Sequence, residues 1–153
     1  SSTTKGLLCI KKFIQSNTDY CITKQFLNSL KDKFKIMIEG KNSNKVVFLA
    51  IKSYGFKEVS FSYEKVRENL VYFINNNSIT YNFIIGFTEV LVNLYQDNFI
   101  IVAEDMLKYK NNYFSLASTK QGNTFLKYVF RNMTSLNKNY LLQNLLSMNC
   151  KSN

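Results

Sequence analysis

The 153-residue chain contains no histidine, no proline and no tryptophan. Without histidine, imidazole general bases, Ser-His-Asp or Cys-His nucleophile systems and His-ligated zinc or haem are all excluded. The five glycines form neither a GxGxxG nor a GxxxxGKS/T phosphate-binding loop. We therefore expect a protein that is not an enzyme and that has no cofactor and no metal site.

The chain has only three cysteines, and their spacing predicts no disulfide framework. Cys9, Cys21 and Cys150 are odd in number and lack CxxC spacing, which argues against a disulfide scaffold or a zinc site and fits a reducing intracellular compartment. The chain begins with Ser and shows no charged-then-apolar leader. No apolar run approaches the roughly 18 to 20 residues of a membrane span, so we expect none.

The sequence gives little indication of a pair of acidic residues that could act in catalysis. Glu64 and Glu68 lie one helical turn apart beside Lys65 and Arg67, as solvated surface carboxylates do. Glu89 is a lone charge in an apolar stretch and has no acidic partner nearby in the sequence. We predict no catalytic residue.

The formal net charge is +10, which raises the question of nucleic-acid binding. Eighteen of the 20 basic residues are Lys, whereas bidentate recognition of phosphates and bases favours Arg. Lys, Asn, Ile, Phe and Tyr, which have A/T-rich codons, make up 73 of the 153 residues. The Lys excess is thus explained by coding bias, and we expect no nucleic-acid partner; a lysine-rich nucleic-acid binder is kept as an alternative.

Apolar residues recur with a helical period along almost the whole chain, which predicts an all-α protein. A polar break is expected at Asn17 or Thr18, and we find no internal repeat, linker or second-domain signal, so one domain over residues 1–153 is predicted. Nine helices are expected, at residues 3–16, 19–39, 45–54, 62–75, 81–95, 99–108, 111–118, 124–132 and 135–148.

The helix expected at 81–95 is apolar on nearly all sides. Small or polar residues lie only along one line, at Asn82, Gly86, Glu89 and Asn93. A helix of this kind is normally buried, so we expect it to be the central helix of a bundle of about seven to nine helices.

Two motifs in this region resemble the Bcl-2 family of apoptosis regulators. The stretch 77–87 (NSITYNFIIGF) is similar to the family's first homology region, Asn-Trp-Gly-Arg followed by a buried helix. The stretch 120–126 (KQGNTFL) is similar to the second, a Gly-Gly-Trp that opens a short helix. Tyr81, Asn82 and Phe83 stand where the family has Trp, Gly and Arg, as in divergent viral members, and the A/T-rich composition suits a large DNA virus such as a poxvirus.

The resemblance implies a Bcl-2-like bundle that inhibits host apoptosis. Such proteins bind the BH-3 helices of pro-apoptotic proteins of the Bak, Bax and Bim type in a hydrophobic groove. Phe83 cannot form the family's Arg–Asp pair with the bound helix, so affinity would come from buried apolar area. The groove residues that we predict are Met37, Ile51, Tyr54, Val66, Leu70, Phe73, Asn82, Phe83, Gly86, Phe87 and Val90.

The resemblance leaves several alternatives open. Some viral relatives have a blocked groove and modulate innate immune (NF-kappa-B) signalling through other faces, and Phe83 or Tyr54 filling the trough would favour that function. Two further possibilities stay open: the chain could promote cell death as other members of the family do, and it could form a homodimer. The implied location is the host cell cytoplasm, or the mitochondrial outer membrane if a C-terminal anchor lies beyond this sequence.

Overall fold

The computed structural model describes residues 4–16, 19–55, 57 and 59–152, and every regular element within them is a helix. The predicted all-α fold is confirmed. Residue 3, where the first helix was expected to start, and the polar break at residues 17–18 lie outside the described residues.

Each of the nine expected helices is present, and two of them are each divided in two. The divisions fall at Lys33 (φ −106°, ψ 14°) and Asn69 (φ −119°, ψ 20°). Leu30, Phe34 and Ile38 are buried at a spacing of four across the first division, so periodicity alone does not reveal it. The helices are α1 (Thr4–Ser16), α2 (Tyr20–Asp32), α3 (Phe34–Glu39), α4 (Ser43–Tyr54), α5 (Phe61–Glu68), α6 (Leu70–Asn76), α7 (Ser78–Tyr95), α8 (Phe99–Lys108), α9 (Asn112–Ala117), α10 (Lys120–Arg131) and α11 (Ser135–Ser152), with 3-10 turns η1 (Gln96–Asn98) and η2 (Tyr109–Asn111).

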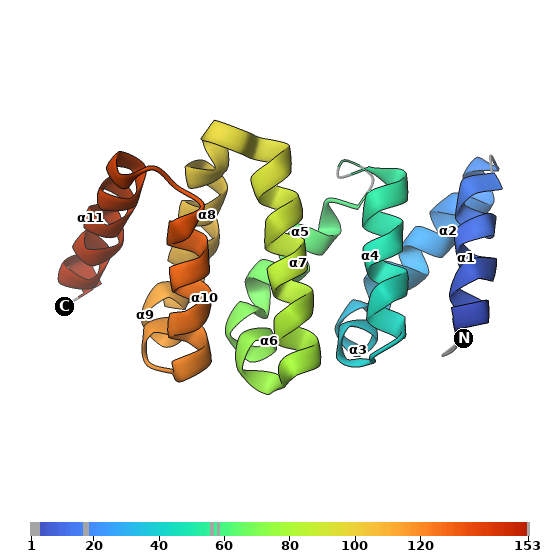
Figure 1. Cartoon of the computed structure of the whole chain (residues 1–153), viewed down its shortest axis with the longest axis horizontal. Coiled ribbons are helices and arrows are strands. Elements are labelled where there is room, and N and C mark those ends of the chain that lie inside the picture. Colours follow the sequence, from blue (N-terminus) through green and yellow to red (C-terminus); the bar gives the residue numbers. More distant parts are fainter. Residues whose placement is uncertain (1–3, 17–18, 56, 58, 153) are drawn as a thin grey trace. The chain divides into compact units, whose positions relative to one another are not determined.

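The helices form two compact units, residues 1–66 (unit 1) and 67–153 (unit 2). In unit 1, α4 packs against α1 and α3, and α2 packs against α3; α1 and α4 run side by side (Figure 1). The ring of Phe34 meets that of Phe61 edge-on, with centroids 6.3 Å apart. The prediction of one domain over the whole chain stays a prediction.

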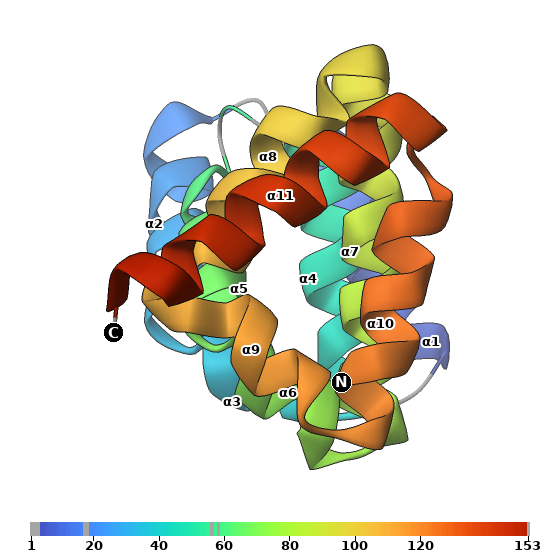
Figure 2. The same ribbon diagram turned by 90° about the vertical axis from the view of Figure 1, so that its left-hand side faces the viewer.

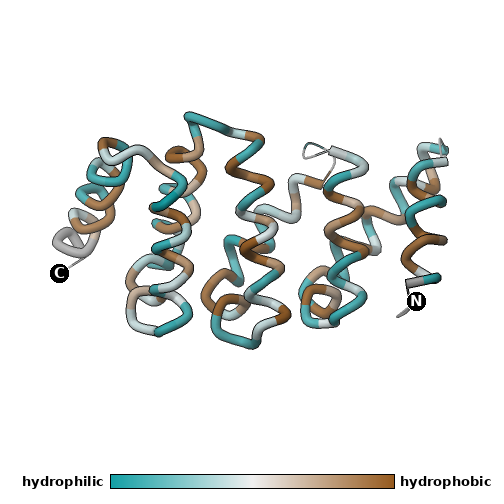
Figure 3. The backbone as a smooth tube through the Cα atoms, viewed as in Figure 1, coloured by the Kyte–Doolittle hydropathy of each residue, from teal (hydrophilic) through white to brown (hydrophobic). Residues whose placement is uncertain are grey.

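In unit 2, α6 packs against α7, α9 against α10, and α11 against α8 (Figure 2). Apolar residues lie along the helices, and the turns between them are mostly polar (Figure 3). The fully buried large side chains of this unit include Leu70, Phe73, Ile74, Ile84, Phe87, Leu91, Phe99, Met106 and Phe125.

The order of helices recurs three times, although no internal repeat is evident in the sequence. Each repeat consists of a first helix, a short second helix of six or seven residues, and a third helix. The second helix packs against the third in every repeat. The repeats are α2–α3–α4, α5–α6–α7 and α8–α9–α10, over residues 20–54, 61–95 and 99–131.

Matching positions of the third helices have matching burial. We number them from the small residue in the first turn, which is Ser43 in α4, Thr80 in α7 and Gly122 in α10. Residues three, four and seven places later are buried in all three helices: Val46, Val47 and Ala50; Phe83, Ile84 and Phe87; Phe125, Leu126 and Val129. Residues two and nine places later are exposed in all three: Lys45 and Lys52; Asn82 and Glu89; Thr124 and Arg131. We call these exposed sites outward positions 2 and 9.

The second helices share a register as well. Their first residues (Phe34, Leu70 and Asn112) and their fifth residues (Ile38, Ile74 and Leu116) are all buried. Both helices of each pair thus bury one side and expose the other, as amphipathic helices do.

Helix α7 is buried along one side. Thr80, Phe83, Ile84, Phe87, Thr88 and Leu91 are buried, and Asn82, Glu89 and Asn93 on the predicted polar line are exposed. Leu94 is 52% exposed, and Ile85, Val90 and Val92 are half-buried. Burial around nearly the whole helix, which the sequence predicts, is therefore not found.

Candidate functional site

The predicted groove residues divide between the two units. Met37, Ile51, Tyr54 and Val66 belong to unit 1, and the other seven belong to unit 2. Met37, Tyr54, Gly86 and Val90 are half-buried, and Asn82 is exposed. The remaining six are at most 4% exposed: Ile51, Val66, Leu70, Phe73, Phe83 and Phe87.

Those six side chains are core residues in this structure, and their assignment to a ligand groove stays a prediction. Phe83 stacks on Phe87, with centroids 6.1 Å apart. Both rings are buried on the same side of α7, because Phe83 and Phe87 lie one helical turn apart. The other two third helices also bury apolar residues at these places. The helical period of apolar residues predicts that these residues face inward, but it does not distinguish residues that line a ligand groove from residues of the hydrophobic core.

Tyr54 is held within unit 1. Its ring lies against Phe26, with centroids 6.2 Å apart. Burial raises the pKa of the Tyr54 hydroxyl, and the nearby polar side chain of Thr23 opposes that rise. Tyr54 thus contributes to packing between α2 and α4, which leaves little of its ring for a ligand.

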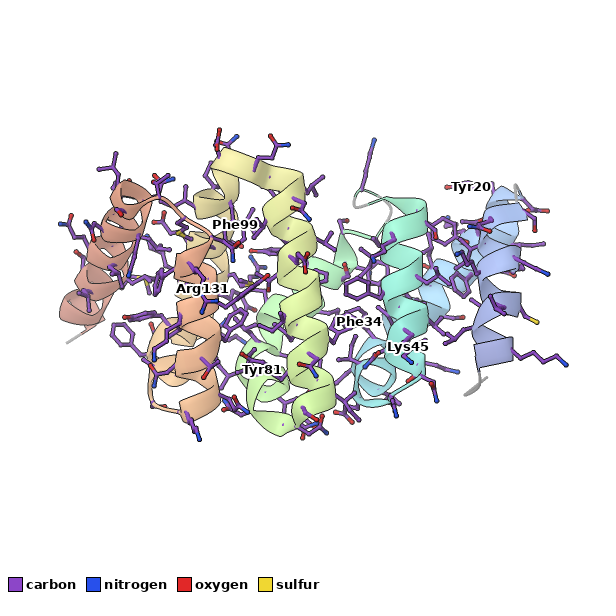
Figure 4. The ribbon with its side chains drawn as sticks, viewed as in Figure 1. Tyr20, Phe34, Lys45, Tyr81, Phe99 and Arg131 are labelled. Carbon is purple, nitrogen blue, oxygen red and sulfur yellow. The ribbon has the colours of Figure 1, made fainter. Side chains whose placement is uncertain are left out.

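The outward positions of the third helices are the recurring exposed feature of the fold. They carry Lys45 and Lys52 on α4, Asn82 and Glu89 on α7, and Thr124 and Arg131 on α10. Lys45 and Arg131 are labelled in Figure 4, each on its third helix. Cations, amides and hydroxyls of this kind bind phosphates and donate to or accept from base edges. Half-buried residues lie between them, six places after the small residue, at Leu49, Gly86 and Tyr128.

In unit 1 this face is basic. Helix α4 contains no acidic residue, and Lys45 and Lys52 at its outward positions are exposed. The ammonium of Lys52 lies 5.0 Å from the centroid of the half-buried Phe48 ring. The exposed side of α4 therefore offers two cations with an aromatic ring between them.

In unit 2 a half-buried tyrosine lies on each of the two third helices, Tyr81 on α7 and Tyr128 on α10. Burial raises the pKa of the Tyr128 hydroxyl on α10, and the Glu89 carboxylate on α7 raises it further. Burial likewise raises the pKa of Tyr81 on α7. Both hydroxyls therefore stay neutral at pH 7 and can donate hydrogen bonds to a ligand.

The starts of α7 and α10 are fixed by side-chain caps. Asn77 accepts from the Thr80 amide at 3.0 Å, and the Thr80 hydroxyl accepts from the Asn77 amide at 3.3 Å, which is a capping box. The Thr119 hydroxyl accepts from the Gly122 amide at 3.0 Å. The two motifs that resemble the Bcl-2 family thus form the capped beginnings of two third helices.

The described part of the chain holds no group of three or more Cys, Asp and Glu side chains that could bind a metal ion. Cys9 and Cys21 are exposed free thiols. No helix among the described residues combines the length and apolar character that crossing a membrane requires.

Sequence reasoning missed the outward positions because it missed the repeat. The available signal was a small residue followed by apolar residues three, four and seven places later, at 43–50, 80–87 and 122–129. The residue types differ from repeat to repeat, so the signal becomes clear only once helix bounds are known.

The chain was compared with known proteins. No family model matches it, and no curated protein and no solved structure is significantly similar to it. The resemblance to the Bcl-2 family rests on the two quoted motifs, and membership of that family stays a prediction.

Proposed function

We propose that this chain is a non-enzymatic helical-repeat protein that binds single-stranded RNA through the outward faces of its third helices. The observation that carries the proposal is the shared register: outward positions 2 and 9 are exposed in every repeat and carry mostly basic or hydrogen-bonding side chains. Helices that expose polar side chains at the same two places suit a ligand that is itself a chain of similar units.

Helical repeats are one of the known means of reading RNA. In such proteins one base is read per repeat by two or three side chains of one helix. Each third helix here offers a comparable set, such as Lys45, Phe48 and Lys52 on α4. Repeats of 33 to 35 residues, three helices each, fall in the size range of helical-repeat units.

A single strand fits these faces better than a duplex. Half-buried aromatic rings at Phe48, Tyr81 and Tyr128 lie among the polar side chains and can stack on unpaired bases. The Watson–Crick edges of bases are free only in a single strand, and the Asn82 amide can donate to and accept from such an edge. The proposal reverses the expectation of no nucleic-acid partner, which came from composition before the exposed positions were known.

Charge reversal on the third helices should weaken RNA binding. We expect the double substitution Lys45→Glu, Arg131→Glu, one outward position in each unit, to raise the Kd for a 12-nucleotide RNA at least tenfold, because two phosphate contacts become repulsions. Fluorescence anisotropy at about 0.1 M salt measures this.

The matched control reverses the same number of charges elsewhere. Lys24 on α2 and Lys138 on α11 are exposed but lie outside the third helices. The double substitution Lys24→Glu, Lys138→Glu should change the Kd less than threefold. Equal losses in the two variants would mean that net charge alone, and no particular face, governs binding.

A second candidate is the inhibition of host apoptosis by capture of BH-3 helices. Its support is that the two motifs that resemble the Bcl-2 family both start helices of unit 2, α7 and α10. Calorimetric titration with BH-3 peptides of about 26 residues tests it, and sub-micromolar binding of several peptides would support it.

Absence of peptide binding by the folded protein would leave the modulation of innate immune signalling as the alternative within that family. Its specific support is the burial of Phe83, which is 4% exposed, together with the packing of Tyr54 on Phe26. Such a protein would act through surfaces other than the predicted groove.

A further inference from the structure

Lysine and asparagine are distributed in opposite ways between the two units. Unit 1 contains 12 of the 18 lysines and four of the 20 asparagines, and unit 2 contains six lysines and 16 asparagines. Five acidic residues lie in each unit, so the net charge is +7 in the 66 residues of unit 1 and +3 in the 87 residues of unit 2.

Coding bias does not explain this division. Both residues have A/T-rich codons, so a bias toward such codons would enrich both along the whole chain. Their separation therefore needs a cause at the level of the protein.

The same division appears at the outward positions. Outward position 2 holds Lys45 in unit 1 but the uncharged Asn82 and Thr124 in unit 2. Outward position 9 holds Lys52 in unit 1, and Glu89 and Arg131 in unit 2. Within unit 1 both positions are cationic, whereas in unit 2 the chemistry differs from helix to helix.

These side chains recognise different parts of a nucleic acid. A lysine ammonium is a mobile point charge that binds phosphates whatever the base. An asparagine amide donates and accepts at once and can pair with the edge of adenine. The side chains of several asparagines of unit 2 bond within the protein, for instance those of Asn112 and Asn123. The side chains of Asn82 and Asn93, on the exposed line of α7, form no hydrogen bond with another described residue.

We infer that the two units divide RNA recognition: unit 1 supplies the electrostatic affinity for the phosphate backbone, and unit 2 supplies the preference among bases. The inference rests on the proposed function, because it assigns parts of that same activity to particular helices.

Removal of charge from unit 1 tests the first half. For the double substitution Lys45→Gln, Lys52→Gln, we expect the slope of log affinity against log salt to become shallower by about 1.4, because each phosphate contact to a single strand contributes about 0.7. Affinity should fall by one common factor for 12-nucleotide oligo(A), oligo(C) and oligo(U). The double substitution Lys24→Gln, Lys31→Gln removes two exposed charges of the same unit from α2 and should leave the slope unchanged.

Removal of polar groups from unit 2 tests the second half. For the double substitution Asn82→Ala, Thr124→Ala, we expect the ratio between the best and the worst oligonucleotide to shrink at least fivefold, with the salt slope unchanged. The inference is overturned if the wild type shows no base preference, if the unit 1 variant changes the preference, or if the unit 2 variant changes only the slope. Failure of the wild type to bind any RNA would overturn the proposed function as well, which distinguishes the two failures.

Discussion

Gly122→Ala is expected to lower the free energy of unfolding by about 3 kcal/mol, because the added methyl group would meet backbone atoms. A Cβ at Gly122 would lie 2.6 Å from the Cα and the carbonyl carbon of Leu116, and closer still to the Leu116 carbonyl oxygen. Leu116 belongs to α9, so α9 and α10 must separate to admit it. Urea unfolding followed by circular dichroism at 222 nm measures the loss.

Gly86 is the matched control, because it lies inside a neighbouring helix of the same unit. The corresponding places in the other third helices hold Leu49 and Tyr128, so we expect a small side chain to be accepted at Gly86. Gly86→Ala should therefore raise the free energy of unfolding by about 0.5 to 1 kcal/mol. If Gly122→Ala were as stable as the wild type, the close approach of α9 to α10 would be wrong.

Asn112→Asp is the second large effect, with an expected loss of about 3 kcal/mol at pH 7. The Asn112 side chain is 6% exposed, and its amide nitrogen donates to the carbonyl oxygens of Arg67 at 3.1 Å and Met106 at 2.9 Å. A carboxylate has the same shape but no proton to donate, so it would face two acceptors inside the protein.

The loss should depend on pH in a defined direction. Burial and the two carbonyls favour the protonated form, so the pKa of the introduced carboxyl should be raised in the folded state. The deficit relative to the wild type should be smallest below about pH 4, the unfolded value, and grow as pH rises through the folded pKa. Asn111→Asp, at the exposed neighbour, should cost less than about 0.5 kcal/mol at any pH; a deficit at Asn112 that did not vary with pH would contradict the proposed contacts.

Much of the fold is predictable from the sequence. The apolar period gave all nine helical ranges, and the polar line on α7 at Asn82, Glu89 and Asn93 is exposed as expected. The divisions at Lys33 and Asn69 were not predictable, because one residue outside helical geometry leaves the apolar spacing intact. Leu94 is exposed although the apolar pattern of residues 81–95 predicts a buried helix, because single exposed apolar residues are common on protein surfaces.

The candidate site was much less predictable. Phe83 and Phe87 are buried in the core. A groove would be lined by the same type of residue, so the sequence alone does not distinguish the two locations. Outward position 2 holds Lys45, Asn82 and Thr124, whose side chains differ in chemistry. These three residues correspond to one another only because each lies two places after the small residue in the first turn of its helix. This correspondence between the third helices depends on which residues are buried, so it can be recognised only once burial is known.

The central claim is that the outward faces of the third helices bind single-stranded RNA. The most direct test is a fluorescence anisotropy titration of the wild-type chain against one labelled 12-nucleotide RNA, alone and annealed to its complement, at about 0.1 M salt. The account predicts a Kd of about 1 µM or tighter for the single strand and binding at least tenfold weaker for the duplex. Equal affinity for both forms, or no binding to either by the folded protein, would contradict it.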